Sequence, residues 1–349
     1  MDERVLKLTF ADGQPAARDR SAMKNIYHHA AVLEGPQSVC VKSMRLPEIA
    51  PHQIRVRLRG CGICGSNLPV WEGRPWFKYP LEPGAPGHEG WGIVDAVGGT
   101  VDHLRAGDRV AVLSYHAFAE HDVVDGALAL KMPDVAEDAP FPGEALGCAV
   151  NVFRRAKIVA GEWVAVVGVG FLGALLVQLA AKNGAKVIAL SRRKFSLDIA
   201  ERMGARQTLQ IGETSESATA AAAAVREITG GAGCSCVIEA TGLQSALDLA
   251  TELTAERGRL IIAGYHQDGL RQVNMQLWNW RGLDVINAHE RDSRVYVQGM
   301  KEAAALIVDG TLNPSPLYTH RYDLGSLNRA FTDMRDRESG FLKGLLIYD

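Results

Sequence analysis

The sequence predicts an α/β protein of two domains, in which an irregular β domain precedes a doubly wound parallel sheet. Two patterns indicate this fold class. From Ile26 to about Met132, short strands alternate with glycine and proline, and from about residue 150 onward, strands alternate with helices. The length of 349 residues agrees with two domains, because one domain usually takes about 100–200 residues.

Composition excludes several classes of protein. Hydrophobic residues make up 47% and charged residues 22%, which are ordinary globular values and exclude intrinsic disorder, collagen and a disulfide scaffold. The 38 basic and 40 acidic residues give a net charge of −2, which provides no general attraction to nucleic acid. Unevenly spaced cysteines and an opening stretch without a long apolar core predict free thiols, a cytoplasmic location and no membrane partner.

Residues 1–23 are expected to form a polar N-terminal extension. In the β domain that follows, apolar and charged residues alternate in stretches such as 54–60, which is typical of strands with one buried face. Residues 71–90 contain four prolines and four glycines, so we expect a loop there. A last strand at 341–348 follows the α/β region, and the tail is expected to return to the first domain.

The α/β domain is predicted from its alternating elements. Strands are expected at 163–167, 186–191, 234–240, 257–265 and 283–289. Helices are expected at 171–185, 194–205, 216–230 and 243–255, and two more follow at 293–310 and 324–337. Because this alternation is typical of a parallel sheet covered on both faces, the apolar run at 163–181 is interpreted as a buried strand and helix rather than a membrane span.

Gly168, Gly170 and Gly173 form the pattern G-x-G-x-x-G, with Phe171 and Leu172 between the last two glycines. The pattern follows an apolar strand and opens a helix, which is the context of a dinucleotide-binding Rossmann turn. The first glycine would allow the tight turn, the second the approach of a pyrophosphate, and the third the close packing of helix on strand. The alternative is a structural turn without a ligand.

Ser191, Arg192 and Arg193 end the second strand of this domain. An NAD site usually places Asp or Glu here to bind the ribose 2′-hydroxyl, whereas a hydroxyl with two guanidinium groups suits the 2′-phosphate of NADP. The sequence therefore predicts NADP(H) in preference to NAD(H). The alternative is a solvated basic start of the following helix.

The β domain also contains candidate zinc ligands. Cys64, the loop dipeptide His88-Glu89, and either Glu144 or Cys148 could converge to give the three protein ligands that a catalytic zinc needs. The C-x-x-C spacing that ends at Cys64 is also that of a redox pair, but here it follows a strand rather than opening a helix.

The stretches GCGICGSN, GAPGHEGWGIVDAVGGTV and AGDRVAV, followed by the glycine turn, resemble the zinc-containing medium-chain alcohol and polyol dehydrogenases. The resemblance covers about residues 24–349. It implies a GroES-like catalytic domain at 24–151 and 290–349, a Rossmann NADP-binding domain at 152–289, and an active site between the two.

The resemblance also implies an activity. A hydride would pass between an alcohol or polyol, or the matching ketone or aldehyde, and NADP(H). A zinc-free quinone or enone reductase of the same superfamily is one alternative, and a nonenzymatic NADP-binding protein is another.

Metal ligands follow from the same resemblance. Cys64 and His88 match zinc ligands, and Glu89 matches a glutamate that in some members also reaches the metal. Glu144 lies 24 residues before the glycine turn, at the place of the remaining protein ligand in polyol dehydrogenases. We prefer it to Cys148, which falls where such enzymes usually contact the nicotinamide end.

Ser66 matches the hydroxyl that begins the proton relay, and Lys343 matches a basic residue that reaches the cofactor phosphates. Asn67 replaces an aspartate that normally supports the zinc histidine, so an amide is expected to do this less strongly. Pro69 replaces a relay histidine of some members. Because the four-cysteine lobe of the family is missing between residues 108 and 121, we expect one catalytic zinc per chain.

Four rings are candidates either for the substrate cleft or for local packing: Trp71, Trp76, His116 and His289. The resemblance further implies assembly, because relatives associate through the edge strands of their Rossmann sheets. Residues 282–289 are apolar enough to form such an edge, so we expect a homodimer or homotetramer.

Overall fold

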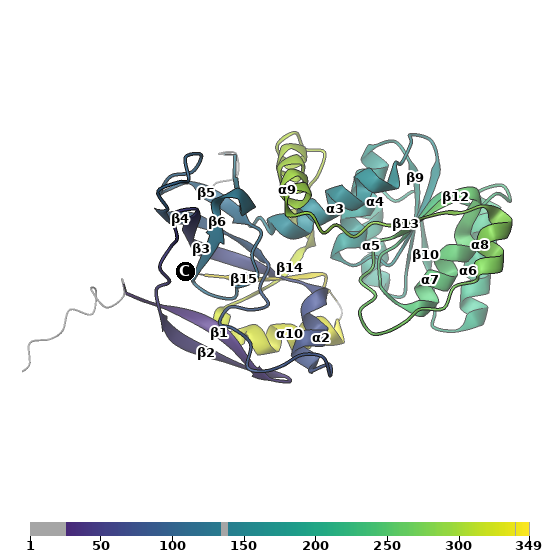
Figure 1. Ribbon diagram of the computed structural model, residues 1–349. Helices are drawn as coiled ribbons and strands as arrows, with labels where there is room; N and C mark the ends of the chain where they lie inside the picture. The colour runs from purple at the N-terminus through teal and green to yellow at the C-terminus, as the bar shows by residue number, and fades with distance from the viewer. Residues whose placement is uncertain (1–25, 134–138, 339, 349) are drawn as a thin grey trace, which may run out of the picture.

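The computed structural model describes residues 26–133, 139–338 and 340–348, so the expected extension at 1–23 lies outside the described residues. Figure 1 shows two lobes. Between them, α3 (Gly143–Ala156) and α9 (Ser293–Val308) pack against each other. Asn151 of α3 donates from Nδ2 to the Val295 carbonyl of α9 at 3.3 Å.

One lobe is built on a seven-stranded sheet in the order β14-β15-β3-β4-β5-β7, and β6 pairs with β3 as well. Its strands are β3 (Gln53–Ile63), β4 (Glu89–Val97), β5 (Arg109–Val112), β6 (His121–Asp125), β7 (Ala129–Lys131), β14 (Tyr318–Tyr322) and β15 (Lys343–Ile347). In β3, Ile54, Val56 and Leu58 are buried and the arginines between them are more exposed, as the alternating pattern predicts. Since β15 pairs antiparallel with β3, the prediction that the tail returns to this lobe is confirmed.

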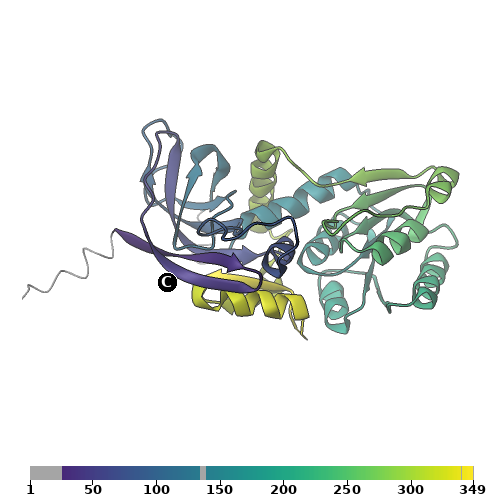
Figure 2. The ribbon, with the colours of Figure 1, turned by 60° about the horizontal axis from the view of Figure 1, so that its bottom comes forward.

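A two-stranded ribbon of β1 (Tyr27–Gly35) and β2 (Ser38–Arg45) lies beside α10 (Leu327–Asp336), as Figure 2 shows. The short helix α2 (Leu68–Glu72) also packs on α10, and it occupies the first two positions of the predicted loop at 71–90. Trp71 of α2 is 1% exposed, its ring lies 5.8 Å from that of Phe331, and its indole donates to Asn328 Oδ1 at 2.8 Å. Trp71 is therefore a packing residue and no part of a substrate cleft.

The other lobe is a six-stranded parallel sheet in the order β10-β9-β8-β11-β12-β13. Its strands are β8 (Trp163–Val167), β9 (Lys186–Ser191), β10 (Gln207–Gln210), β11 (Cys234–Glu239), β12 (Thr254–Ile262) and β13 (Asp284–Asn287). Its helices are α4 (Phe171–Lys182), α5 (Lys194–Arg202), α6 (Ser215–Ile228), α7 (Gln244–Leu253) and α8 (Met275–Arg281). The strand order reverses between β8 and β11, and the loop after β8 therefore lies where such sheets bind nucleotides.

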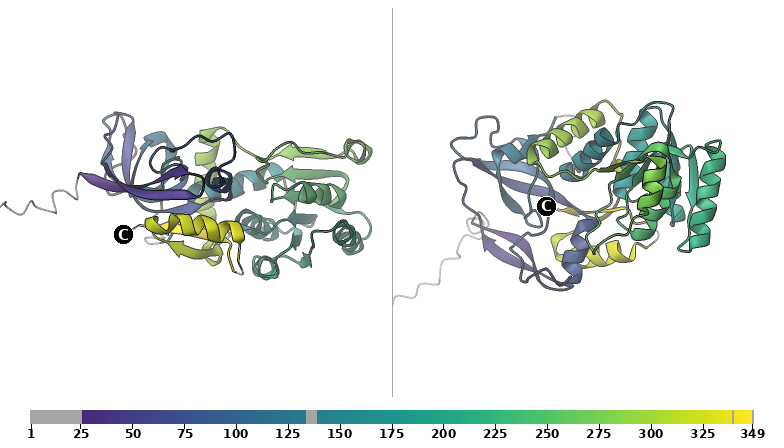
Figure 3. Two further views of the ribbon diagram at one scale, coloured as in Figure 1. Left: turned by 90° about the horizontal axis from the view of Figure 1, so that it is seen from below. Right: turned by 45° about the vertical axis from the view of Figure 1, so that its right-hand side comes forward.

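Helices cover both faces of this sheet, as predicted (Figure 3). Val164 and Val166 of β8 pack with α3, α4 and α5, whereas Ala165 and Val167 pack with α6 and α7. The apolar run at 163–181 is thus a buried strand and helix. Among the described residues, no helix has both the length and the apolar character needed to cross a bilayer.

Several elements were not predicted from the sequence. The strand β10 has the sequence QTLQ and is only partly buried, so it lacks an apolar pattern. Helix α8 has no buried residue, and α3 lies in a region that was interpreted only by resemblance. The division of the chain at residues 151/152 and 289/290 stays a prediction.

Candidate functional site

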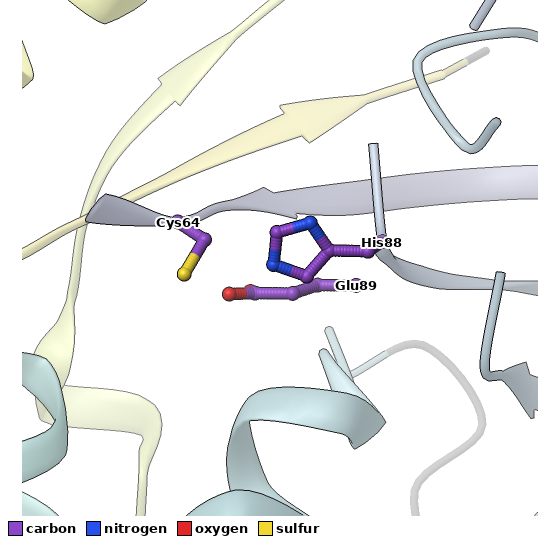
Figure 4. Close-up of side chains that lie close together, drawn as sticks. All are labelled: Cys64, His88 and Glu89. Carbon is purple, nitrogen blue, oxygen red and sulfur yellow. The ribbon is translucent and has the colours of Figure 1, made fainter. Parts of the chain in front are cut away.

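Cys64, His88 and Glu89 come together where β3 ends and β4 begins. Cys64 follows the last residue of β3, and Glu89 is the first residue of β4. Because the two strands are antiparallel and Gly62 pairs with Glu89, the two chain segments meet. One ligand atom from each side chain lies within 4.8 Å of the other two, and the side chains point toward one another in Figure 4. Among the described residues, this is the one group of three or more such side chains at that spacing.

The donor atoms of this group suit zinc, which binds thiolate, imidazole and carboxylate ligands. The orientation of His88 also agrees with a zinc site. Its Nδ1 lies 2.9 Å from the Pro86 carbonyl, and since a carbonyl only accepts, Nδ1 carries the proton and Nε2 is left for a metal.

Asn67 supports this loop in a different way from the expected one. Its Oδ1 accepts from the Cys64 backbone N–H at 3.0 Å, and its Nδ2 donates to the Pro86 carbonyl at 3.0 Å. The side chain is 1% exposed. Asn67 therefore fixes the backbone on both sides of the group, and the carbonyl of Pro86, rather than residue 67, orients the ring of His88.

Negative charge is concentrated around His88. Burial by itself lowers the pKa of His88, but the hydrogen bond and charge of Cys64, with the charges of Glu144 and Glu89, raise it to about 10. Such a site favours a cation.

A buried ammonium lies beneath this group. Lys343 Nζ is 2.6 Å from Glu89 Oε1 and 2.5 Å from Oε2. Burial lowers the pKa of Lys343, but the charge of Glu89 raises it above its usual value. Gly62 leaves room for the carboxylate, because a Cβ at this position would lie 1.8 Å from Glu89 Oε2.

Glu144 and Cys148 both lie on α3, one helical turn apart. Burial raises the pKa of both side chains. The charge of His88 lowers the pKa of Glu144 and that of Glu89 raises it, whereas the charges of Glu144 and Cys64 both raise the pKa of Cys148. Neither is within the 4.8 Å group. The choice of Glu144 over Cys148 as a further ligand therefore stays a prediction.

Two tyrosines near the group were missed by the sequence analysis. Burial raises the pKa of Tyr296 on α9, and the charges of Cys148 and Glu144 raise it further. Burial and the charge of Glu89 raise the pKa of Tyr318 on β14. Both residues come more than 140 positions after the predicted ligands, and no local pattern distinguishes them.

The glycine turn has the geometry that its pattern predicts. Gly168 has a φ of +98°, which favours glycine. A Cβ on Gly173 would lie 2.0 Å from the Gly168 carbonyl oxygen, whereas one on Gly170 would meet no atom within 4 Å. Helix α4 begins at Phe171, so its first N–H groups face the turn.

Phe171 connects this turn to the metal-ligand group. Its ring stacks on Tyr318, with centroids 6.0 Å apart, and Lys343 Nζ lies 4.8 Å from the centroid of the Phe171 ring. Lys343 thus lies between the nucleotide turn and Glu89. Its contact with cofactor phosphates stays a prediction.

The end of β9 has no carboxylate at the position typical of NAD sites. Ser191 is buried, and its Oγ accepts from the Arg193 backbone N–H at 3.3 Å. Arg192 forms an ion pair with Glu213, which the sequence analysis missed. Arg193 Nη1 donates to the Phe341 carbonyl of the other lobe at 2.7 Å.

The other ring candidates lie at partly exposed positions. Trp76 is 57% exposed, and His116 Nε2 lies 3.0 Å from Glu82 Oε2. His289 stacks on Tyr265 with ring centroids 5.5 Å apart. None of these residues belongs to the group of Cys64, His88 and Glu89, so their part in binding substrate stays a prediction.

A nucleotide-type parallel sheet beside a thiol, imidazole and carboxylate group defines the class of zinc-dependent nicotinamide dehydrogenases. Comparison with known proteins specifies the family. Residues 50–134 match the alcohol dehydrogenase GroES-like domain, and residues 172–307 match the zinc-binding dehydrogenase family. The chain belongs to the zinc-type medium-chain dehydrogenase/reductase family and is an oxidoreductase, which confirms the expected GroES-like and Rossmann folds.

Relatives match over most of their length. Sorbitol dehydrogenase of Mus musculus is 28% identical over 334 residues, covering 86% of this chain and 90% of that protein. Probable D-xylulose reductase A of Aspergillus clavatus is 29% identical over 342 residues, covering 87% and 92%. The solved structure of galactitol-1-phosphate dehydrogenase from Escherichia coli has a TM-score of 0.78 and 25% identity, covering 92% of this chain and 100% of that one.

Proposed function

We propose that the protein interconverts a polyol and the matching ketone with NADP(H), using one zinc ion held by Cys64, His88 and Glu144. The observation that carries this proposal is the group of Cys64, His88 and Glu89 within 4.8 Å, which lies beside the glycine turn. Glu144 is included as a ligand because its charge acts on His88 from α3, whereas Glu89 is already paired with Lys343. The polyol class is supported by the names of the relatives, which include sorbitol dehydrogenases and xylulose reductases.

The residues of the site have separate tasks in this proposal. Zinc bound here would supply Lewis-acid chemistry to the substrate oxygen, and the nicotinamide would exchange the hydride. Ser66 lies in the short turn Gly65–Asn67, two residues after Cys64, and would take the hydroxyl proton. The Pro86 carbonyl holds the imidazole of His88 in the metal-binding tautomer. Lys343 neutralises Glu89. The negative charge that remains on the proposed ligands is therefore no larger than one divalent ion can balance.

The metal ligands are tested by zinc analysis of purified variants. We expect Cys64→Ser and His88→Ala to lose zinc, and Glu144→Ala to lose it as well, whereas Cys148→Ala keeps it. Zinc loss in Cys148→Ala but not in Glu144→Ala would refute the proposed set. A panel of alcohols and polyols, followed at the absorbance band of NADPH, tests the activity. No turnover of any polyol by the zinc-loaded protein would refute the substrate class.

The preference for NADP is supported by the three residues at the end of β9. Each hydrogen bond from arginine to phosphate is worth about 1.5–3 kcal/mol, part of which is offset by desolvation. We therefore expect a preference for NADP+ of roughly 10- to 1000-fold in kcat/KM. The double variant Ser191→Asp, Arg192→Gly should reverse it without changing zinc content. Equal or better turnover with NAD+ by the unmodified enzyme would contradict the proposal.

Assembly is proposed to use the edge strand β13, which pairs with β12 alone among the described strands. Near it, Trp280 of α8 is 86% exposed, and an unpaired strand edge invites association. We expect a homodimer or homotetramer in the cytoplasm, consistent with six free cysteines. A monomer mass by light scattering at micromolar concentration would contradict this.

A further inference from the structure

A segment of the other lobe that carries a third arginine is held against the end of β9. Arg193 Nη1 donates to the carbonyl of Phe341, a residue just ahead of β15. Four positions before Phe341 in the chain, Arg337 caps the C-terminus of α10, and its backbone N–H donates to the Asp333 carbonyl at 2.9 Å. The hydrogen bond of Arg193 therefore holds the end of β9 against the segment that carries Arg337.

Few acidic side chains balance the positive charges of these arginines. Among the residues that the structure describes, neither Arg193 nor Arg337 forms an ion pair, and Arg192 pairs with Glu213, whose side chain is 79% exposed. Burial lowers the pKa of Arg193, and the positive charges of Arg337 and Arg192 lower it further. Arg337 is exposed to solvent, and the surrounding protein together with the charge of Arg192 lowers its pKa as well. The charges of three arginines thus act on one another, and one solvated carboxylate is the only acidic partner that the described residues give them, which suits the binding of an anion.

The backbone of Arg337 determines which substitution tests its side chain. The residue has a φ of +46° and a ψ of +49°, the left-handed conformation that favours glycine. The helices α2 and α8 end in the same conformation with Gly73 and Gly282, and α3 ends in it with Lys157. An arginine takes this position at a conformational cost, so a glycine here would relieve the backbone while removing the guanidinium.

We propose that Arg337 is a specificity-determining residue, whose guanidinium binds the 2′-phosphate of NADP(H) together with Arg192 and Arg193. This inference rests on the proposed preference for NADP(H). One of the five donors of Arg193 is used by the Phe341 carbonyl and one of Arg192 by Glu213, and the others are available to a ligand at the end of β9, where the adenosine ribose lies in this fold. The phosphate thus contacts both lobes at once.

The test is binding of adenosine 2′,5′-bisphosphate and of 5′-AMP to the full chain, measured by calorimetry without turnover. The variant Arg337→Gly removes the guanidinium and keeps a residue suited to the backbone, so we expect the melting temperature to stay equal or to rise. Affinity for the bisphosphate should fall at least about tenfold, the factor of one well-made charged contact, and affinity for 5′-AMP should not change. Arg329→Gln, an exposed arginine of the same helix paired with Asp333, is the control and should change neither affinity.

The outcomes separate this inference from the one on which it rests. If the unmodified protein prefers the bisphosphate and Arg337→Gly keeps that preference, then Arg192 and Arg193 suffice and the role of Arg337 is refuted alone. If the unmodified protein binds both nucleotides equally, the preference for NADP(H) fails and the inference with it. A fall in affinity for both nucleotides in Arg337→Gly would indicate a structural role and would also overturn the inference.

Discussion

Lys343 and Glu89 are 254 residues apart in the chain and form an ion pair whose side chains are 4% and 0% exposed. The pair joins β15 to the first residue of β4, directly beneath the proposed zinc ligands. The ammonium therefore has two tasks, because it holds the sheet together and also neutralises a carboxylate of the site.

Removing the ammonium should be costly. In Lys343→Met, the Glu89 carboxylate stays buried without a partner, and we expect the free energy of unfolding to fall by about 3–5 kcal/mol. The double variant Lys343→Met, Glu89→Gln should recover much of this loss. Urea denaturation of both variants, with zinc content measured in parallel, checks the prediction. Lys42→Met breaks an exposed pair with Glu34 and should have little effect, so an equal loss in both lysine variants would contradict the explanation.

Asn67→Asp should destabilise the loop, although aspartate is the residue that the family pattern favours. A carboxylate still accepts from the Cys64 N–H, but it cannot donate to the Pro86 carbonyl. We expect the free energy of unfolding to fall by about 1–3 kcal/mol. Asn313→Asp is a matched control, because its hydrogen bond to the Ser315 N–H uses the side-chain oxygen. Higher zinc content and a higher melting temperature in Asn67→Asp would show instead that His88 turns toward residue 67.

Stability should fall in mild acid because of a buried histidine pair. The rings of His28 and His121 lie edge to face, 5.7 Å apart, and neither Nδ1 has a hydrogen-bond partner among the described residues. Burial lowers the pKa of both rings, and the charge of His121 lowers that of His28 further. Asp95, whose Oδ2 lies 3.5 Å from His121 Nε2, and Glu120 act in the opposite direction but do not cancel this effect. Since the unfolded chain binds a proton at about pH 6.5 and the folded chain only at lower pH, stability is lost as the pH falls below about 6.5.

The measurement is the melting temperature between about pH 7.5 and pH 5.5. We expect a fall across this window that is smaller in His28→Gln than in the unmodified chain. His52→Gln replaces an exposed histidine and should leave the pH dependence as it is. Identical pH profiles for all three proteins would rule out the histidine pair as the cause.

Glu213→Gln should strengthen binding of NADP+. The Glu213 carboxylate competes with a phosphate for Arg192, but the pair is exposed, at 52% for Arg192 and 79% for Glu213. An exposed pair of this kind is worth up to about 1 kcal/mol, so KM for NADP+ should fall by roughly two- to fivefold. KM for NAD+ should not change. Glu227→Gln, at the far end of α6, is the control, and an unchanged KM for NADP+ in Glu213→Gln would mean that Arg192 has no phosphate contact.

Local patterns in the sequence predicted much of the fold and part of the site. The turn at Gly168 and the strands around it follow from short-range apolar periodicity, and Cys64 and His88 were found from motifs of a few residues. The ion pair of Lys343 with Glu89 could not be predicted from the residues, because it depends on which strands become neighbours in the sheet. The role of Asn67 depends on the backbone carbonyl of Pro86, and the role proposed for Arg337 depends on the end of α10. Only the folded chain brings these groups into place.

The pairing of β15 with β3 also has a consequence for biosynthesis. The whole parallel-sheet lobe lies between these two strands in the chain, so a ribosome makes β3 and the loop around His88 long before their partner emerges. Domains fold as units during synthesis, and the parallel-sheet lobe is therefore complete while the first lobe still has a gap in its sheet. Until β15 arrives, the nascent chain carries an unneutralised Glu89 and an open edge on β3. If synthesis stops before residue 343, the parallel-sheet lobe is therefore folded, and the first lobe, with its open strand edge, is prone to associate with other chains.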